Sequence, residues 1–460
     1  MIWSRALAAA SVLISLCPAS AGASTRSPYD TLGHSIAAVP TAPPAVAVGE
    51  ALGDEEKVLA SETTLPLLLS LAAQRNPEVQ EARERANAAV ERGRAAGRLP
   101  DLEAKYEQWG VPLSRPYALD QAGTLMLGVR QAFPAPGVLD SRARAGLEEA
   151  RSQFDSLRGR ELDVRARVQH AFFDYYRADR EYRIHLEHVE LSTHIVQLAR
   201  QNYQTGRATQ QDVLRALVDV SRLHTDVSMI QARARSSQAQ LNALMSRPID
   251  ASLGPPAEVT LPTAHTPSSD AETEVEHTRP ELLGADRMVR RSQAMLEEAK
   301  AAARLPSVMA GLDYWYQPTA ETRHAYAAMI SINLPWLNGR HGEEIREAEH
   351  TFAAEVRARA ALLNTVRFEV RDAVARAEAA RQELDILDHD LLPQARNSFE
   401  AAQSAFAAGQ GDALGLLDAA RSFLQVRLDR SRIIAQLGAS LADVERATGS
   451  SNPQPGKGAK

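Results

Sequence analysis

The chain has 460 residues, which is enough for two or three ordinary domains or for one elongated one. Charged residues make up 24% of the chain and aromatic residues only 5%, a mixture that favours long helices over a compact mixed core. The formal net charge of −6 argues against a nucleic-acid partner, and no polybasic stretch is present to hold the chain on an anionic membrane surface.

The N-terminal residues have the pattern of an export signal. Arg5 supplies a positive charge, residues 6–16 form an apolar run, and Ala21-Gly22-Ala23 offers a small-residue cleavage site. The apolar run is too short to cross a bilayer, so we expect it to be removed. The sequence therefore predicts a signal peptide at 1–23 and an exported protein.

Cys17, the only cysteine, lies at the end of the apolar run and leaves two alternatives open. It is either a lipidated N-terminal residue or part of the discarded signal, and the bulky Leu16 before it favours the second. In either case one chain has neither a disulfide nor a Cys-ligated metal site. No later stretch holds eighteen consecutive apolar residues, so no transmembrane helix is predicted.

Beyond an irregular extension at 24–63, the chain consists of two copies of one unit. Four landmarks recur in the same order, at separations of 203, 206, 201 and 203 residues. They are Asn76-Pro77-Glu78 with Arg279-Pro280-Glu281, Arg98-Leu99-Pro100 with Arg304-Leu305-Pro306, Phe133-Pro134 with Leu334-Pro335, and Tyr203/Gly206 with Phe406/Gly409. The units span 64–247 and 279–449, separated by a linker at 248–278 and followed by a disordered tail at 450–460.

Each unit is predicted to open with a helix, at roughly 65–97 and 280–304, followed by two strands. The strands are expected at 100–110 and 122–134 in the first unit, and at 306–317 and 325–335 in the second. Apolar and polar side chains alternate in all four, with a period of two. This pattern is typical of strands between lipid and a water-filled lumen, and the alternative is a half-buried hairpin on a soluble domain.

A long helix follows in each unit, at 138–204 and 340–408, and would be about 100 Å long at 1.5 Å per residue. Pro393 is expected to bend the second of them. A coiled-coil seam is predicted at Val168, Tyr175, Tyr182, Val189, Val196 and Tyr203, with Ala171, Ala178 and Ala199 beside it.

Return helices are predicted at 208–246 and 412–448, and Gly206 and Gly409 permit the reversals before them. Their seams are expected at Val213, Val220, Val227, Ala234 and Leu241, and at Leu416, Phe423, Arg430, Leu437 and Val444. The predicted fold class is mainly α with a small β part. Because four strands cannot close a barrel and open edges are not tolerated in lipid, closure requires several chains.

This duplicated arrangement, with Asn76-Pro77-Glu78 at its start and Gly206 and Gly409 at its tips, resembles the TolC-type outer membrane efflux protein family. The resemblance covers about residues 64–448. It implies a homotrimer in the outer membrane, with a twelve-stranded β-barrel and a long periplasmic α-barrel. It also implies a passive exit duct for efflux or type I secretion, with a periplasmic adaptor and an inner-membrane pump, most closely of the resistance–nodulation–division type. Metal ions, drugs, dyes and protein toxins stay open as cargo.

The resemblance also suggests residues for a periplasmic aperture. Asp418 matches an aperture aspartate and Asp212 an acidic latch partner. Phe406, the counterpart of Tyr203 at the other tip, stands where a latch tyrosine is expected. Gly411 replaces the latch arginine, and Gly415 replaces a second aspartate. We hypothesise that Asp212, Asp412 and Asp418 line a cation-selective mouth; the alternative for Asp412 is that it caps the helix after it.

No motif for catalysis, phosphate binding or a dinucleotide is present, so we expect neither an enzyme nor a cofactor. His185 with His188, and Asp388-His389-Asp390, could hold a metal, but a solvated helix face is the expected interpretation. Trp315 and Trp336 fit interfacial anchors. The main rival is a periplasmic coiled-coil adaptor or a structural envelope protein, and an exported enzyme is a third class.

Overall fold

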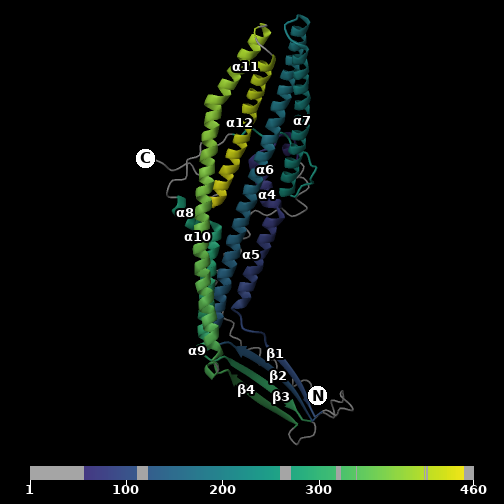
Figure 1. Ribbon diagram of the computed structural model, residues 1–460. Coiled ribbons are helices and arrows are strands. Elements are labelled where there is room, and N and C mark those ends of the chain that lie inside the picture. Colours follow the sequence, from purple (N-terminus) through teal and green to yellow (C-terminus); the bar gives the residue numbers. More distant parts are fainter. Residues whose placement is uncertain are drawn as a thin grey trace, which may run out of the picture.

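The computed structural model describes residues 56–110, 123–259, 271–317, 323–337, 339–408, 410 and 413–449. The chain is elongated, with a small sheet at one end and a long stack of helices rising from it (Figure 1). Within these ranges no helix is both long and apolar enough to cross a membrane. The expected signal peptide with Cys17, the tail, Gly409, Gly411 and Asp412 lie outside the described residues.

The first unit contains four helices and two strands: α4 (Leu65–Arg75), α5 (Pro77–Ala96), β1 (Glu103–Trp109), β2 (Thr124–Phe133), α6 (Val138–Gln204) and α7 (Gln210–Leu244). The single helix predicted at 65–97 is wrong, because it is interrupted at Asn76. This residue has extended backbone angles, since the proline after it disfavours a helical conformation. Its side chain accepts a 2.9 Å hydrogen bond from the Glu78 amide and so caps α5.

The second half of the described chain has three elements more. It comprises α8 (Ala271–Thr278), α9 (Pro280–Arg304), β3 (Val308–Tyr316), β4 (His324–Ile332), a short 3₁₀ turn η2 (Pro335–Leu337), α10 (Arg340–Ile386), the π-turn η3 (Leu387–Leu391), α11 (Leu392–Ala407) and α12 (Ala413–Thr448). Helix α8 falls inside the segment predicted to be a linker. It forms because Val275 is buried in an apolar cluster with Leu282 and Val366.

The four strands form one antiparallel sheet in the order β1-β2-β3-β4. Its register aligns Tyr106 with Leu127, Leu127 with Tyr314, and Tyr314 with Tyr326, so apolar side chains share one face. That face is open: Leu127 is 58% exposed and Tyr326 80%. The sheet therefore presents its apolar face outward, the opposite of a hairpin packed on a soluble core.

The other face of the sheet carries the polar side chains. Here Arg130 lies 4.0 Å from the carboxylate of Asp313, whose side chain is nearly buried. Gly128 is the cross-strand neighbour of Asp313, and a Cβ at this position would fall 2.1 Å from the Asp313 Oδ1 atom. Glycine thus provides the space in which the carboxylate lies.

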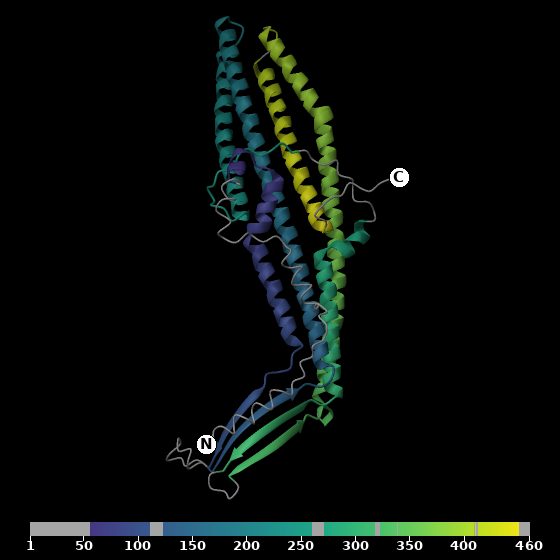
Figure 2. The same cartoon turned by 180° about the vertical axis from the view of Figure 1, so that it is seen from behind.

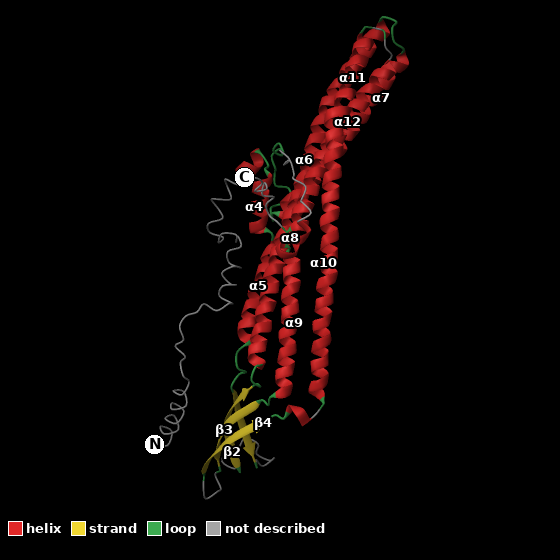
Figure 3. Ribbon diagram, turned by 90° about the vertical axis from the view of Figure 1, so that its left-hand side faces the viewer, coloured by secondary structure: helices red, strands yellow, loops and turns green. Residues whose placement is uncertain are grey.

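Helix α6 is the central element of the helical part, since α5, α7, α9 and α12 all pack along it (Figure 2). The main core gathers around Val168, Ala171 and Phe172 of this helix. Near the sheet, α5 crosses α6 so closely that a Cβ on Gly146 would lie 2.9 Å from the Gly93 Cα atom. Figure 3 shows this bundle from the side, with the sheet below it and the helix tips at the far end.

The predicted seam of α6 is only partly correct in its upper half, where Val196 and Ala199 are buried as expected. Tyr203 is 50% exposed and Val189 only half buried, whereas Ala178, His185, Ser192 and Ala199 form the buried line. These four residues continue the predicted Ala171–Ala178 line at steps of seven. The buried line therefore keeps the heptad spacing but lies three positions from the predicted one, because the helices packed along α6 decide which of its faces is covered.

The seam of α7 is shifted in the same way. Ala216, Leu223, Ile230 and Ser237 are buried, while Val213, Val220, Val227 and Ala234 are half buried. Only Leu241 of the predicted set is fully buried. The predicted residues therefore lie at the edge of the contact between α7 and α6 rather than at its centre.

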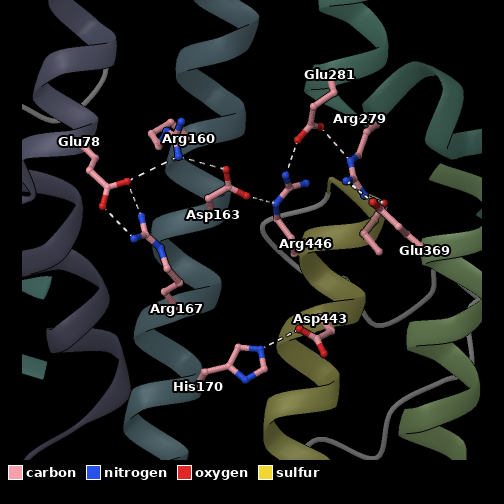
Figure 4. Close-up of polar contacts among 11 residues, drawn as sticks. Glu78, Arg160, Asp163, Arg167, His170, Arg279, Glu281, Glu369, Asp443 and Arg446 are labelled. Atoms are coloured by element: carbon pink, nitrogen blue, oxygen red, sulfur yellow. Dashed lines mark hydrogen bonds and ion pairs between the residues drawn. The ribbon is translucent and has the colours of Figure 1, made fainter. Parts of the chain in front are cut away.

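An ion-pair network joins the two units halfway up the molecule (Figure 4). At the start of α5, Glu78 accepts two hydrogen bonds from Arg167, at 2.8 and 2.7 Å, and these contacts lower its pKa. At the equivalent start of α9, Glu281 pairs with Arg446, which also reaches Asp163 of α6 at 2.5 Å. The network therefore ties α6 of the first unit to α9 and α12 of the second.

Candidate functional site at the helix tips

The hairpins α6–α7 and α11–α12 end together at the pole opposite the sheet (Figure 1). In the first, Gly206 has a φ of 74°, and the amide of Arg207 donates a 2.7 Å bond back to the carbonyl of Asn202. Only glycine adopts this conformation easily, which explains the residue at the reversal. In the second, the Gln410 amide bonds the Ala405 carbonyl at 3.0 Å.

A shared apolar cluster holds the two tips against each other. It comprises Ile195, Val196 and Ala199 of α6, Ala216 of α7, Phe399 and Phe406 of α11, and Leu416, Leu417 and Ala420 of α12. Near its base, the ring of Phe399 stacks on that of Phe423 at 5.8 Å between centroids. The two tips therefore pack against each other within the chain.

The equivalent aromatics Tyr203 and Phe406 differ in their surroundings. Phe406 is 2% exposed within the apolar cluster, and its carbonyl accepts a 3.5 Å hydrogen bond from the Asn202 side chain. Tyr203 is 50% exposed. A phenyl ring without a hydroxyl can be buried with no polar partner, so Phe406 contributes to packing where a tyrosine would require an acceptor.

Asp212 belongs to a capping box at the start of α7. Its carboxylate accepts hydrogen bonds from the Thr209 amide at 2.9 Å and from the Thr209 hydroxyl at 2.7 Å. The backbone amide of Thr209 is the main cause of the lowered pKa of Asp212. This carboxylate is thus charged and held in place at the tip by its own helix.

Asp418 lies on the first turns of α12, with its side chain 62% exposed and 3.7 Å from Arg421. The Arg421 guanidinium also binds Asp219 of α7 at 2.8 Å, and the side chain of Asp219 is only 8% exposed. Arg421 therefore bridges the two hairpins below the tip. Gly415, at the position expected for a second aspartate, is exposed in α12.

Asp219 and Arg421 were missed in the sequence analysis. The available signal was an acidic residue between the buried seam positions Ala216 and Leu223, where a charge requires a partner. Because the seam of α7 was predicted three residues away, Asp219 fell on a face expected to be solvated. The partner could not be identified, since Arg421 lies 202 residues later in the chain.

The histidine pair on α6 is not on a solvated surface, contrary to the prediction. His185 and His188 are 6% and 3% exposed, and the Nδ1 atom of His185 lies 2.8 Å from the Glu181 carbonyl. The Nε2 atom of His188 has no hydrogen-bond partner among the described residues. Burial lowers the pKa of His188 to about 4, although Asp219 opposes this shift.

Among the described residues, no group of three or more His, Cys, Asp or Glu side chains could hold a metal ion. The Asp388-His389-Asp390 segment lies in the π-turn η3, where Asp388 pairs with Arg430 at 2.5 Å. His389 is exposed and pairs with Asp385 of the preceding turn. These side chains are therefore engaged in helix–helix and intrahelical ion pairs.

We expect Arg421→Gln to loosen the two tips, because it leaves the carboxylate of Asp219 nearly buried without its cation. The local stability of residues around 195–220 and 413–425 should fall by about 1–2 kcal/mol. Hydrogen exchange of the tip amides measures this change. Arg396→Gln is the matched control, since Arg396 forms only an exposed pair with Glu400 in the same hairpin. If the tip amides exchanged equally slowly in both variants, the proposed role of Arg421 as a bridge between the hairpins would be wrong.

The buried His188 predicts a loss of stability in acid. Its folded pKa is about 4 and its ordinary value 6.5, so the unfolded chain binds the proton more tightly. Stability from this residue is complete above pH 6.5 and falls as the pH drops toward 4, by at most about 3 kcal/mol. Urea unfolding between pH 7 and pH 4 should show a shallower decline in His188→Gln than in the parent. His224→Gln, an exposed histidine on α7, is the control.

Solved structures of other proteins share this fold, and three of them are the following. The chain is similar to a membrane protein from Pseudomonas aeruginosa, with a TM-score of 0.73 and 20% identity over 84% of this chain and 92% of the other. The outer membrane protein VceC from Vibrio cholerae gives 0.71 and 19%, over 84% and 96%. The outer-membrane channel OprN gives 0.71 and 18%, over 84% and 90%. No curated protein sequence matches the chain.

The model of one sequence family, the outer membrane efflux proteins, matches residues 68–247 and 273–450. The two matched segments coincide closely with the two units of the duplication, and together they cover most of the chain. This protein therefore belongs to the outer membrane efflux protein family.

Proposed function

We propose that this protein is the outer-membrane exit duct of a tripartite efflux or type I secretion system, and that it acts as a homotrimer. A periplasmic adaptor and an inner-membrane pump, of the resistance–nodulation–division type, would complete the system. The duct itself is passive and no chemistry occurs in it, since the pump supplies the energy. Membership of the efflux protein family supports this assignment.

The outward-facing apolar side of the sheet is the observation that carries the proposal. Strands β2, β3 and β4 have ten, nine and nine residues, the length that a tilted strand needs to cross the apolar part of a bilayer. Leu127, Leu312, Tyr326 and Ile330 are between 47% and 80% exposed on this side. Water would solvate such a surface poorly, whereas lipid chains would cover it.

The sheet edges support a trimer. Strands β1 and β4 are the two outer strands, and each has one edge without a partner strand among the described residues. In lipid these backbone groups require hydrogen bonds, and pairing β1 of one chain with β4 of the next satisfies them. Three chains then give twelve strands, which is above the eight of the smallest membrane barrels.

The inner face of such a barrel would be polar. Glu103, Lys105, Glu107, Arg130 and Asp313 all lie on the face opposite the apolar one, as the pairing register requires. Charged side chains that face a water-filled lumen keep their hydration, whereas on the lipid side they would be strongly unfavourable. The division of charge between the faces is therefore what a wet duct through a membrane needs.

At the opposite pole, we propose that Asp418 and Asp212 contribute to an acidic periplasmic mouth, together with Asp412. The exposed carboxylate of Asp418 is only partly neutralised, since Arg421 is shared with Asp219. Three chains would repeat each carboxylate around the axis, and rings of this kind favour cations. Tyr203 and Phe406 then have different roles: Tyr203 lies at the exposed rim of the mouth, and Phe406 packs in the apolar cluster below it.

A matched pair of alanines tests the duct. Ala327 and Ala328 are adjacent in the middle of β4 and lie on opposite faces of the sheet. Ala328→Arg should oppose insertion by about 2–4 kcal/mol per chain, since it places a cation in lipid, whereas Ala327→Arg should be tolerated beside Asp313. The readouts are heat-resistant oligomers in outer-membrane fractions and conductance in planar bilayers. A water-soluble monomer without conductance, or equal effects of both variants, would refute the proposal.

The aperture is tested by Asp418→Ala in the same bilayers. We expect the cation preference of single channels to fall, because three negative charges leave the mouth of a trimer. Asp429→Ala removes a carboxylate lower on the same helix, where it pairs with Arg432, and serves as the control. Unchanged ion selectivity in Asp418→Ala would exclude this residue from the mouth.

A further inference from the structure

The second long helix contains one wide turn that the first lacks. In the π-turn η3, the Leu392 amide bonds the Leu387 carbonyl five residues back, whereas the Leu387 amide bonds Glu383 and Leu384. Pro393 follows at once and has no amide hydrogen to donate. An α-helical turn here would press the proline ring against the carbonyl of residue 389, and the wide turn removes this clash.

Residue numbers locate a one-residue insertion in the same place. Gly137 precedes Tyr203 by 66 residues, while their counterparts Gly339 and Phe406 are 67 apart. Below the π-turn, buried residues of the two units correspond at an offset of 202. These pairs are Val164 with Val366, Val168 with Val370, Ala171 with Ala373, Tyr175 with Ala377, and Ala178 with Ala380.

Above the π-turn the offset becomes 203, since Ser192 corresponds to Ala395 and Val196 to Phe399. The buried faces of both helices therefore continue in register only because the extra residue is absorbed within η3. A π-turn is the form that a single inserted residue takes in a helix whose packing is otherwise kept. Helix α6 has neither the insertion nor a proline and is α-helical over its whole length.

A charged clasp joins this turn to α12. The Arg430 guanidinium contacts both oxygens of Asp388, at 2.5 and 3.3 Å. Arg430 occupies a position whose counterpart in the first unit is Val227, so an ion pair stands where the other hairpin has an apolar side chain. Such a pair depends on distance and direction, and it can open and reform more readily than an interlocked apolar contact.

The π-turn also borders open space. A groove of about 780 Å³ separates α6 from α11 and α12 at this level, and Leu392, Pro393, Arg430, Tyr176 and Ile184 are among the residues that line it. Ile386 and Leu391, at the two ends of η3, are 51% and 43% exposed. Across this groove Arg427 of α12 bonds Glu187 of α6 at 2.6 Å, and apolar contact with α6 resumes in the tip cluster around Phe406. The turn is thus held by the clasp and by the buried side chain of Leu387, with open space along one side.

We infer that η3, with Pro393 and the Asp388–Arg430 clasp, is a hinge at which the tip of the second hairpin changes its angle to the first. The one-residue insertion supplies the weak turn, Pro393 prevents its conversion to an α-turn, and the clasp holds the bent position. The hinge is a property of the single chain. Its use in opening the periplasmic end rests on the proposed function.

Distances between spin labels on one chain test the hinge. In a Cys17→Ser background, labels at Ser404 of α11 and Gln211 of α7 measure the distance between the tips. Labels at Ala379 of α10 and Ser236 of α7 measure the distance between the hairpins below the turn, and all four sites are exposed. Arg430→Met should broaden the tip distances and leave the lower ones unchanged. The matched control is Arg432→Met, which breaks the Glu383 pair one turn away. Equal tip distributions in Arg430→Met and Arg432→Met would overturn the clasp.

The turn itself is tested by removing His389 together with Pro393→Ala, which restores an α-helix and keeps the register on both sides. We expect one narrow tip distribution and, in planar bilayers, loss of the transitions between conductance levels. A distribution as broad as that of the parent would overturn the hinge. If this variant fails to fold, Pro393→Ala alone should narrow the tip distances, and no narrowing there counts against the proposal.

The outcomes separate the hinge from the duct. Tip distances that respond as expected in a parent protein without conductance would support the hinge and refute the duct. If the parent protein conducts, but neither Arg430→Met nor the change at His389 and Pro393 alters the tip distances, the hinge is refuted and the duct is still supported.

Discussion

The unsatisfied edges of a four-stranded sheet constrain everything else in this protein. Backbone groups on the outer sides of β1 and β4 have no partner strand in the described part of the chain, and the apolar face beside them has no cover. A surface of this kind is stable only when other copies pair with its edges and lipid covers its face. Closure by several chains follows from this requirement, and the proposed trimer meets it.

The duplication supplies two similar arms, and their differences are as informative as their likeness. Glu78 and Glu281 occupy the same place at the start of α5 and α9, yet the first binds arginines of α6 and the second an arginine of α12. Tyr203 is exposed at one tip while Phe406 is buried at the other. The long helix of the first unit is therefore uninterrupted, whereas that of the second unit contains the π-turn and Pro393.

Charge at the tip is arranged around one cation. Arg421 is shared between the nearly buried Asp219 and the exposed Asp418, so the same side chain ties the hairpins together and moderates the acidity of the proposed mouth. The buried imidazole of His188 lies near Asp219 of this bridge, and its Nε2 atom has no hydrogen-bond partner in the described part of the chain. Packing of the tips and the electrostatics of the mouth are consequently coupled through a few polar residues in the seam.

Periodicity in the sequence was sufficient for the element types and the alternation in the sheet. A period of two assigns the side chains of β3 and β4 to two faces, although Met309 and Trp315 share the face of Asp313. Landmarks such as Pro77 and Pro280 mark the starts of equivalent helices, because proline is tolerated in a first turn. The break at Asn76 was also encoded locally, in a residue before a proline, but two apolar stretches on either side made it look like one helix.

The buried line of a helix 67 residues long could not be derived in the same way. Two lines with heptad spacing run along this helix, and only neighbouring helices decide that His185 and Ser192 are inside and Tyr203 outside. Pairings such as Asp219 with Arg421 and Asp388 with Arg430 join residues on separate helices, and tertiary packing alone brings them together. The sequence by itself determined the repeated elements and the faces of the strands, since these depend on neighbours along the chain. Tertiary structure decided which polar residues are buried, and with what partner, because those energies depend on neighbours in space.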